Sequence, residues 1–254
     1  MIKEIYNFIE TFAPFKLSSN YDNTGILVNT NRDIKKILLS LDITKDVVKE
    51  AIETNTNLII SHHPIIFHPL KRLSADIPAV KLAAENIGVI AAHTNFDAAS
   101  YGISDIMAEL LGLENTGECL EEVKGFENCG YGRICTCKEI STLDLVKKVK
   151  EVFDCKFVRY IDSGKQNTRV AVCSGSGANL FPVAFEMGCD VLITGDIKHD
   201  LFVDAFNCGF SLIDAGHFYT ENVGMIWLKK QLKKQFPSLD INIAEKNIDI
   251  TEYL

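Results

Sequence analysis

Short apolar runs alternate with amphipathic segments along the first half of the chain. The runs are rich in Ile, Leu and Val and too short to be helices, whereas the segments between them carry apolar residues at helical spacing. The pattern predicts, in order, a strand at 37–41, a helix from Thr44 to about 55, a strand at 58–60, a helix from about 78 to 88, and a strand at 89–92. Fully apolar strands that alternate with helices indicate a parallel sheet covered on both faces.

The second half of the chain repeats this pattern. It predicts strands at 169–173, 191–193 and 210–213, separated by helices at about 183–188 and 201–207. The stretch 119–168 combines glycine-rich turns with a helix at 142–153. The halves match element by element, in pattern more than in residue identity, and no linker rich in Pro, Gly or Ser separates them. We therefore expect two α/β units of similar topology that pack together.

Potential metal ligands gather where the predicted strands end. They are His62, His63, Asp97, His217 and Glu221. In open α/β sheets the carboxyl ends of the strands form the ligand-binding edge, because the loops there vary while the sheet holds them. The strand ends of the two halves also correspond. His62 and His63 match Gly195-Asp196, and His93-x-x-x-Asp97 matches His217-x-x-x-Glu221.

The types of these residues suit a pair of divalent cations. His62 and His63 are adjacent, and where a strand ends the backbone turns, so both imidazoles can enter one cleft and serve two neighbouring metals. His217 and Glu221 are four residues apart at the start of a helix expected near 219, so their side chains can converge. The carboxylate of Asp97 can bridge two cations. A mixture of imidazole and carboxylate fits Zn, Mn, Fe(II) or Co and does not choose among them.

Each residue also has a simpler explanation. The His62-His63 pair alone is more often an ordinary strand end, Asp97 alone a helix N-cap, and Glu221 alone a surface residue. His93 is a candidate for a core histidine or one that orients Asp97. The set as a whole favours the metal site, because its members recur at equivalent strand ends of two repeated units.

Three other features leave alternatives open. His68 is expected at the surface or at a pocket rim. His199 either lines the site or is a polar residue at a helix start. The segment 174–177, Ser-Gly-Ser-Gly, lies between a strand and a helix, where its backbone amides could cradle a phosphate. Its spacing matches neither a Rossmann fingerprint nor a P-loop, so a simple glycine turn is the favoured interpretation.

Composition narrows the class of protein. The formal net charge of -8 argues against a duplex nucleic-acid binder, which usually needs a basic face. The eight cysteines are scattered without any Cys-x-x-Cys, which favours reduced thiols in a reducing compartment. No apolar run approaches the roughly 20 residues of a membrane span. The start of the chain lacks the apolar stretch of a signal peptide, so we expect a cytoplasmic protein.

Several of these segments together resemble the Nif-three-like dinuclear-metal family, whose members are often labelled GTP cyclohydrolase I type 2 homologs. The resemblance covers most of the chain, in the short form of the family. It lies in 21–25 (YDNTG), 60–64 (ISHHP), 93–97 (HTNFD), 173–177 (CSGSG), 194–196 (TGD) and 215–221 (AGHFYTE). The combination is specific, although no single segment is. In 195–200 the histidine stands one place earlier than in many relatives, so no family role is carried over to His199.

The resemblance implies a fold and an assembly. It implies two three-layer α/β/α units of similar topology, with the metal site in the cleft between them, and a toroidal homohexamer. The first unit would comprise residues 1–123 plus 222–254 and the second 124–221, with the final helix, 227–236, packed back on the first unit. The implied ligands of the two metal ions are the residues that match His62, His63, Asp97, His217 and Glu221, the set reached above from the residues.

Two functions follow from these observations. The first is a metal-dependent hydrolase, in which two cations generate hydroxide near neutral pH. The family label indicates opening of the guanine imidazole ring of GTP by attack at C8, and a phosphoesterase would use the same ions. The second is a non-catalytic metal-binding oligomer that acts as a scaffold or regulator. We expect self-association, a nucleotide as the potential substrate, and no membrane partner.

Overall fold

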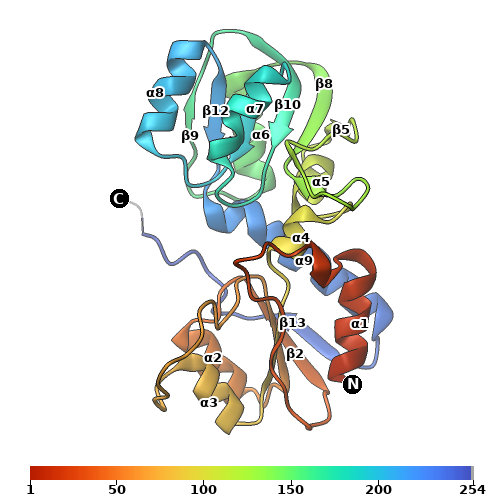
Figure 1. Cartoon of the computed structure of the whole chain (residues 1–254). Helices are drawn as coiled ribbons and strands as arrows, with labels where there is room; N and C mark the ends of the chain where they lie inside the picture. Colours follow the sequence, from red (N-terminus) through yellow and green to blue (C-terminus); the bar gives the residue numbers. More distant parts are fainter. Residues whose placement is uncertain (253–254) are drawn as a thin grey trace. The chain divides into compact units, whose positions relative to one another are not determined.

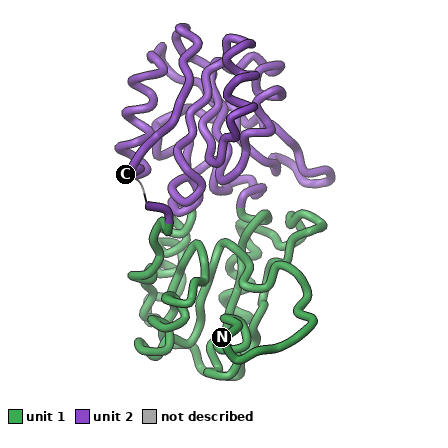
Figure 2. Tube along the Cα trace, turned by 90° about the vertical axis from the view of Figure 1, so that its left-hand side faces the viewer, with its two compact units in different colours: residues 1–96, 224–250 green, residues 97–223, 251–254 purple. Residues whose placement is uncertain are grey.

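The computed structural model describes residues 1–252, which form two compact units (Figure 2). Unit 1 comprises Met1–Phe96 and Gly224–Ile250. Unit 2 comprises Asp97–Val223 together with Thr251 and Glu252. The chain passes from unit 1 to unit 2 within a short helix, α4 (Thr94–Ala98), and returns within a long one, α9 (His217–Gln235). No helix in the described part of the chain combines the length and the apolar character that a membrane span requires.

The division between the units differs from the one expected from sequence. Residues 97–123 belong to unit 2 and not to the first unit, and the later boundary lies at Val223 and Gly224 instead of 221 and 222. The reason is packing against the second sheet. Helix α5 (Ile103–Leu110) contacts strands of that sheet, and strand β5 (Glu114–Asn115) pairs with its strand β8 (Arg133–Ser141). These contacts are non-local and leave no signal in the local hydrophobic pattern.

Unit 1 is built on a five-stranded sheet in the order β1-β4-β3-β2-β13. The strands are β1 (Gly25–Val28), β2 (Lys36–Ser40), β3 (Leu58–Ser61), β4 (Gly88–Ala91) and β13 (Asp240–Ile243). All neighbouring pairs are parallel except β1 with β4, which is antiparallel. The parallel core agrees with the fully apolar runs of the sequence, and β2, β3 and β4 are buried almost throughout.

Helices cover both faces of this sheet (Figure 1). On one face, α2 (Lys45–Glu53) and α3 (Pro78–Ala84) pack against the alternate strand residues Leu38, Ile59 and Val89. On the other face lie α1 (Ile2–Phe12) and the unit 1 part of α9, joined by an edge-to-face contact of Phe12 with Trp227 at 5.2 Å between ring centroids. Unit 1 therefore has the expected three layers.

The ends of the helices show which local signals were informative. Thr44 is the N-cap of α2, as predicted, and its hydroxyl accepts a hydrogen bond from the backbone N–H of Val47 at 3.2 Å. Helix α3 ends at Ala84, earlier than predicted, because Asn86 adopts a positive φ of 55° and Gly88 already belongs to β4. The helices predicted near 219 and at 227–236 form a single helix, α9.

Unit 2 contains a six-stranded sheet in the order β5-β8-β10-β11-β12-β9. The further strands are β9 (Arg159–Ile161), β10 (Gln166–Val172), β11 (Val191–Thr194) and β12 (Ser211–Asp214), and a separate hairpin pairs β6 (Glu121–Glu122) with β7 (Gly130–Tyr131). Strands β10, β11 and β12 are parallel, whereas β5, β8 and β9 pair antiparallel with their neighbours.

This sheet also has helices on both faces. Helices α7 (Phe181–Glu186) and α8 (His199–Cys208) pack on the face that carries Leu192 and Leu212. Ser211 points to the opposite face, where its hydroxyl lies 3.2 Å from that of Thr142 at the start of α6 (Thr142–Val152). Helix α5 contacts β8 and β10. Short 3-10 turns, η1 (Phe15–Leu17) and η2 (Ala178–Leu180), complete the elements.

The two units share a core topology and differ at one edge. In each, three parallel strands follow one another through two helices that pack on the same face: β2-α2-β3-α3-β4 and β10-α7-β11-α8-β12. An antiparallel strand flanks the third strand in both, β1 in unit 1 and β9 in unit 2. Beside the first strand, unit 1 has the parallel β13 and unit 2 the antiparallel β8. The predicted repeat of two α/β units is confirmed for this core.

Candidate metal site

Three histidines meet where β3 and β4 of unit 1 end. His62 and His63 follow β3, His93 follows β4, and one ring nitrogen from each lies within 4.8 Å of the other two. The ring centroids of His62 and His63 are 5.2 Å apart, and that of His93 lies 5.0 Å and 5.4 Å from them. Because β3 ends at Ser61, the two adjacent histidines are not held to opposite faces of a strand and contribute to one cluster.

The rings of His62 and His63 are oriented by oxygen acceptors. Nδ1 of His62 lies 2.8 Å from the backbone oxygen of Ala92, and Nδ1 of His63 lies 2.7 Å from Oδ1 of Asp42. Both acceptors are oxygens, so in the neutral ring the proton resides on Nδ1 and the lone pair on Nε2. Metal-binding histidines characteristically present this arrangement, with the second nitrogen bonded to a carboxylate or a backbone carbonyl.

His93 is held by the carboxylate of Asp22, whose side chain is fully buried. Oδ1 of Asp22 lies 2.9 Å from Nδ1 of His93, and Oδ2 accepts from the N–H of Thr94 at 3.2 Å and its hydroxyl at 2.5 Å. Burial alone would raise the pKa of Asp22, but these hydrogen bonds, the charge of His93 and the N–H of Asn23 outweigh burial and lower the pKa to about 2. The carboxylate therefore stays ionised and fixes His93.

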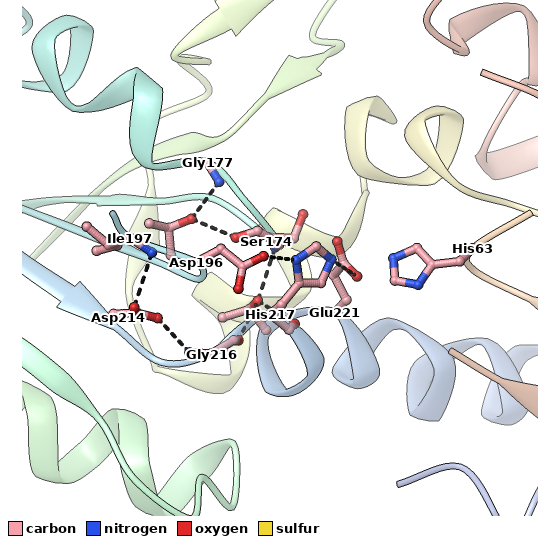
Figure 3. Close-up of polar contacts among 12 residues, drawn as sticks. His63, Ser174, Gly177, Asp196, Ile197, Asp214, Gly216, His217 and Glu221 are labelled. Atoms are coloured by element: carbon pink, nitrogen blue, oxygen red, sulfur yellow. Dashed lines mark hydrogen bonds and ion pairs between the residues drawn. The ribbon is translucent and has the colours of Figure 1, made fainter. Parts of the chain in front are cut away.

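Unit 2 presents a second group of ligand types at the start of α9 (Figure 3). His217 and Glu221 lie one helical turn apart, with Nε2 of the histidine 2.9 Å from Oε2 of the glutamate. Nδ1 of His217 lies 2.7 Å from Oδ2 of Asp196, which follows β11. Burial alone would lower the pKa of His217, but the two carboxylates outweigh burial and raise the pKa to about 9.

The third ligand type in unit 2, Asp97, is bound to the loop after β10. The hydroxyl of Ser174 donates to Oδ1 of Asp97 at 2.8 Å, and the backbone N–H of Ser174 donates to the hydroxyl of Ser104 at 3.2 Å. The next residue, Gly175, has a φ of +58°, and a Cβ at this position would lie 2.1 Å from Oε1 of Glu221. The loop thus requires glycine beside the glutamate and supports Asp97 through its serine.

The backbone amides of this loop are used within the protein. The N–H of Gly175 donates to the hydroxyl of Thr220 at 3.0 Å, and that of Gly177 donates to the hydroxyl of Thr194 at 2.9 Å. Together with the Ser174 amide, they have internal acceptors and do not form a phosphate cradle. The structure therefore supports the glycine-turn interpretation.

Asp214, at the end of β12, fixes the two turns that lead to Asp196 and His217. Its carboxylate accepts hydrogen bonds from the backbone N–H groups of Ile197 at 3.1 Å and Gly216 at 3.0 Å (Figure 3). The same carboxylate pairs with the guanidinium of Arg159. Because the turns after β11 and β12 share one buried acceptor, the distance between Asp196 and His217 is set by the sheet itself.

The remaining histidines have plainer roles. His68 is exposed and contacts the ring of Phe67. His199 is exposed at the first turn of α8, which supports its interpretation as a polar residue at a helix start. The ring of His93 contacts His62 and pairs with Asp22, whereas Asp97, for which the sequence suggested an orienting role of His93, accepts a hydrogen bond from Ser174.

Sequence reasoning missed the carboxylates that orient the imidazoles. Asp42 and Asp196 each follow a strand at the same edge of the sheet as the proposed ligands, which is the signal that would have found them. Asp22 lies in the 21–25 segment on which the family resemblance rests, but nothing in that segment indicates a distant histidine as its partner.

The cysteines do not contribute to the site. All eight are free thiols, and only Cys208 is fully exposed. Burial raises the pKa of Cys135, Cys155 and Cys173 to about 12, so these thiols stay protonated and unreactive at neutral pH. This agrees with the expectation of reduced, partly buried cysteines.

Comparison with known proteins identifies relatives of the whole chain. A family model described as Duf34/NIF3 (NGG1p interacting factor 3) matches residues 1–252. A Clostridium acetobutylicum protein named GTP cyclohydrolase 1 type 2 homolog is 35% identical, over 98% of this chain and 97% of its own length. A Schizosaccharomyces pombe protein named NIF3 homolog is 33% identical, over 84% of this chain and 82% of its own length.

Solved structures agree over nearly the same extent. A hypothetical protein from Staphylococcus aureus superposes with a TM-score of 0.90 at 28% identity, covering 100% of this chain and 99% of its own. Reduced HcgD from Methanocaldococcus jannaschii superposes with a TM-score of 0.83 at 31% identity, covering 96% of this chain and 97% of its own.

Proposed function

The chain belongs to the Duf34/NIF3 family, and we propose that it binds two divalent metal ions and uses them to hydrolyse a purine nucleotide of the GTP type. The proposed ligands are His62 and His63 from unit 1 and Asp97, His217 and Glu221 from unit 2. Shared ions would then join residues that lie far apart in the sequence, and metal binding would be linked to folding.

The observation that carries the proposal is the way in which the imidazole rings are oriented by hydrogen-bond acceptors. Each of the three proposed histidine ligands has its Nδ1 against an oxygen acceptor: Ala92 O for His62, Asp42 for His63 and Asp196 for His217. Three histidines with the same nitrogen engaged, each just after a strand, are what a set of Nε2 metal ligands requires. A polar surface without a metal site does not require the same nitrogen to be engaged in all three rings.

The spacing in unit 2 also fits a cation. With metal–ligand bonds of about 2.0–2.2 Å, two ligand atoms at right angles lie about 3 Å apart. Nε2 of His217 and Oε2 of Glu221 are 2.9 Å apart. This separation fits a metal ion bound by both atoms. It fits equally well a hydrogen bond from a protonated imidazole to the carboxylate, because in both cases positive charge lies beside the carboxylate. The donors are imidazole and carboxylate, so Zn, Mn, Fe(II) and Co all remain candidates.

Bound cations of this kind lower the pKa of a water ligand and polarise the group that it attacks. The chain's own contribution is a proton acceptor and a fixed geometry. We assign the acceptor role to Nε2 of His93, because Asp22 holds the ring through Nδ1. The proposed substrate follows from the name GTP cyclohydrolase 1 type 2 homolog that relatives from Clostridium acetobutylicum and Clostridium perfringens carry. The site of attack would be C8 of the guanine ring.

The test is metal analysis of purified protein followed by a GTP turnover assay. Wild type should hold about two ions per chain, and His63→Ala and Glu221→Ala should lose metal. The matched controls are His68→Ala and Glu186→Ala, which alter an exposed histidine and an exposed glutamate outside the proposed ligand set. Loss of metal in the first pair alone, with GTP consumption by wild type, supports the proposal.

Two other outcomes would contradict parts of the proposed function. Two ions without turnover of GTP or simple phosphate esters would leave a non-catalytic metal-binding scaffold. Absence of bound metal after reconstitution of well-folded protein would overturn the metal site itself. The homohexamer implied by the family resemblance stays a prediction, which light scattering of the metal-loaded protein tests.

A further inference from the structure

An exposed pair of aromatic rings lies beside the histidine cluster of unit 1. Tyr21 and Phe67 have ring centroids 6.4 Å apart at an interplanar angle of 47°. Tyr21 is 68% exposed and Phe67 is 39% exposed. The ring of Phe67 is 6.5 Å from that of His93, which in turn contacts His62 and His63. The pair is therefore separated from the proposed metal ligands by a single imidazole.

The two loops that carry these rings are braced against each other. The side-chain amide of Asn23, two residues after Tyr21, donates to the backbone oxygen of Ile66, directly before Phe67, at 2.5 Å. Asp22, the immediate neighbour of Tyr21, is held by His93 and Thr94. Two large aromatic rings are thus held on constrained backbone with much of Tyr21 and part of Phe67 exposed to solvent.

We propose that Tyr21 and Phe67 form a stacking platform for the purine ring of the substrate. The inference rests on the proposed function and adds to it the residues that select a planar heterocycle. Aromatic side chains stack on nucleobases through their faces, and the contact tolerates different bases because each has a π-face. A ring stacked on Phe67 lies next to the imidazole of His93, the proposed acceptor of the proton that the attacking water releases.

The same loop carries charge suited to the rest of a nucleotide. Lys71 and Arg72 follow Phe67 within five residues, and both are exposed. In a chain with a net charge of -8, two adjacent exposed cations in the loop that carries Phe67 match a base that carries phosphates. This is why we favour a purine nucleotide as the occupant over a second copy of the chain, for which the exposed Leu73 of the same loop would be an equally good contact.

The test is equilibrium binding of guanosine and of GTP to metal-loaded protein, by calorimetry. Tyr21→Ala and Phe67→Ala should each weaken guanosine binding about 5- to 150-fold, the range expected for loss of one stacked aromatic ring. The conservative variants Tyr21→Phe and Phe67→Tyr should bind nearly as wild type, as should the control Leu73→Ala. Lys71→Ala with Arg72→Ala should weaken the binding of GTP and leave that of guanosine unchanged.

The outcomes separate this inference from the proposed function. If wild type turns over GTP but neither alanine variant loses affinity, the platform is wrong and the hydrolase stands. If guanosine binding depends on both rings without any turnover, the platform stands and the hydrolase fails. Absence of guanosine binding to metal-loaded wild type overturns the platform. So does a change in oligomer mass in the alanine variants without a change in affinity, which would identify the rings as a contact between copies.

Discussion

Nδ1 of His217 lies 2.7 Å from Oδ2 of Asp196, and this contact joins the start of α9 to the end of β11. The histidine is a proposed metal ligand and the aspartate is not. The aspartate holds the imidazole in the orientation in which Nε2 meets Glu221. Unit 1 repeats the relationship, with Asp42 against Nδ1 of His63.

Replacing Asp196 with Asn should therefore weaken metal binding without removing a ligand. We expect metal affinity to fall about 10- to 100-fold, the usual effect of losing the partner of a metal-bound histidine. The measurement is competition with a chelator of known affinity. The control is Asp204→Asn, which removes the charge of an exposed aspartate in α8. An equal loss of metal affinity in both variants would mean that the removed negative charge, and not the orientation of His217, causes the effect.

Gly175 provides a steric test of the position of Glu221. Gly175→Ala should displace the glutamate, because the new Cβ would lie 2.1 Å from Oε1, and metal content should fall. Gly164→Ala is the matched control, since Gly164 has a similar φ of +74° with open space around it. The control should lose about 1 kcal/mol of stability from backbone strain and keep its metal. Metal analysis and urea unfolding of both variants distinguish the two effects.

The carboxylate of Asp22 should contribute a pH-dependent part of the stability of unit 1. Its pKa is about 2 in the folded protein against an ordinary 3.8, so the contribution is complete above about pH 4 and disappears as the pH falls toward 2. The shift corresponds to about 2 kcal/mol at neutral pH and about 1 kcal/mol less at pH 3.

The measurement is urea unfolding of wild type and Asp22→Asn at several pH values. The difference in unfolding free energy between the two proteins should be largest at pH 6 and smaller at pH 3. A difference that stays constant over this range would show that the variant loses hydrogen bonds to His93 and Thr94 but no ionised group.

A buried ion pair should dominate the stability of unit 2. The guanidinium of Arg133 pairs with Asp105 at 2.9 Å and donates to three backbone oxygens, with the side chain only 2% exposed. Arg133→Ala should cost about 3–5 kcal/mol, because it removes the charge partner of the buried Asp105 carboxylate and a donor to three backbone oxygens. Lys147→Ala removes an exposed pair of the same length and should have little effect. Comparable losses of unfolding free energy in the two variants, measured by chemical denaturation, would contradict this prediction.

The local hydrophobic pattern predicted the elements correctly where the burial of residues follows the periodicity of a strand or a helix. The strands β2, β3, β4, β10, β11 and β12 were all predicted, because each is an apolar run bounded by polar residues or glycine. The hydrophobic pattern does not show where the two units divide. Residues 97–123 look like a continuation of the first unit, yet α5 and β5 contact β8, whose strand begins at Arg133. Which sheet a segment joins depends on partners that the segment itself does not encode.

By itself, the sequence determined the order of the elements and placed His62, His63, Asp97, His217 and Glu221 at strand ends, since the two periodicities of helix and strand are local properties. Only the tertiary structure decided which nitrogen each imidazole turns toward a carboxylate or carbonyl. It also decided that Tyr21 and Phe67 are exposed side by side. These features depend on contacts between residues 21 to 71 positions apart, such as His63 with Asp42 and His93 with Asp22. Such contacts exist only once the sheet has brought its loops to one edge.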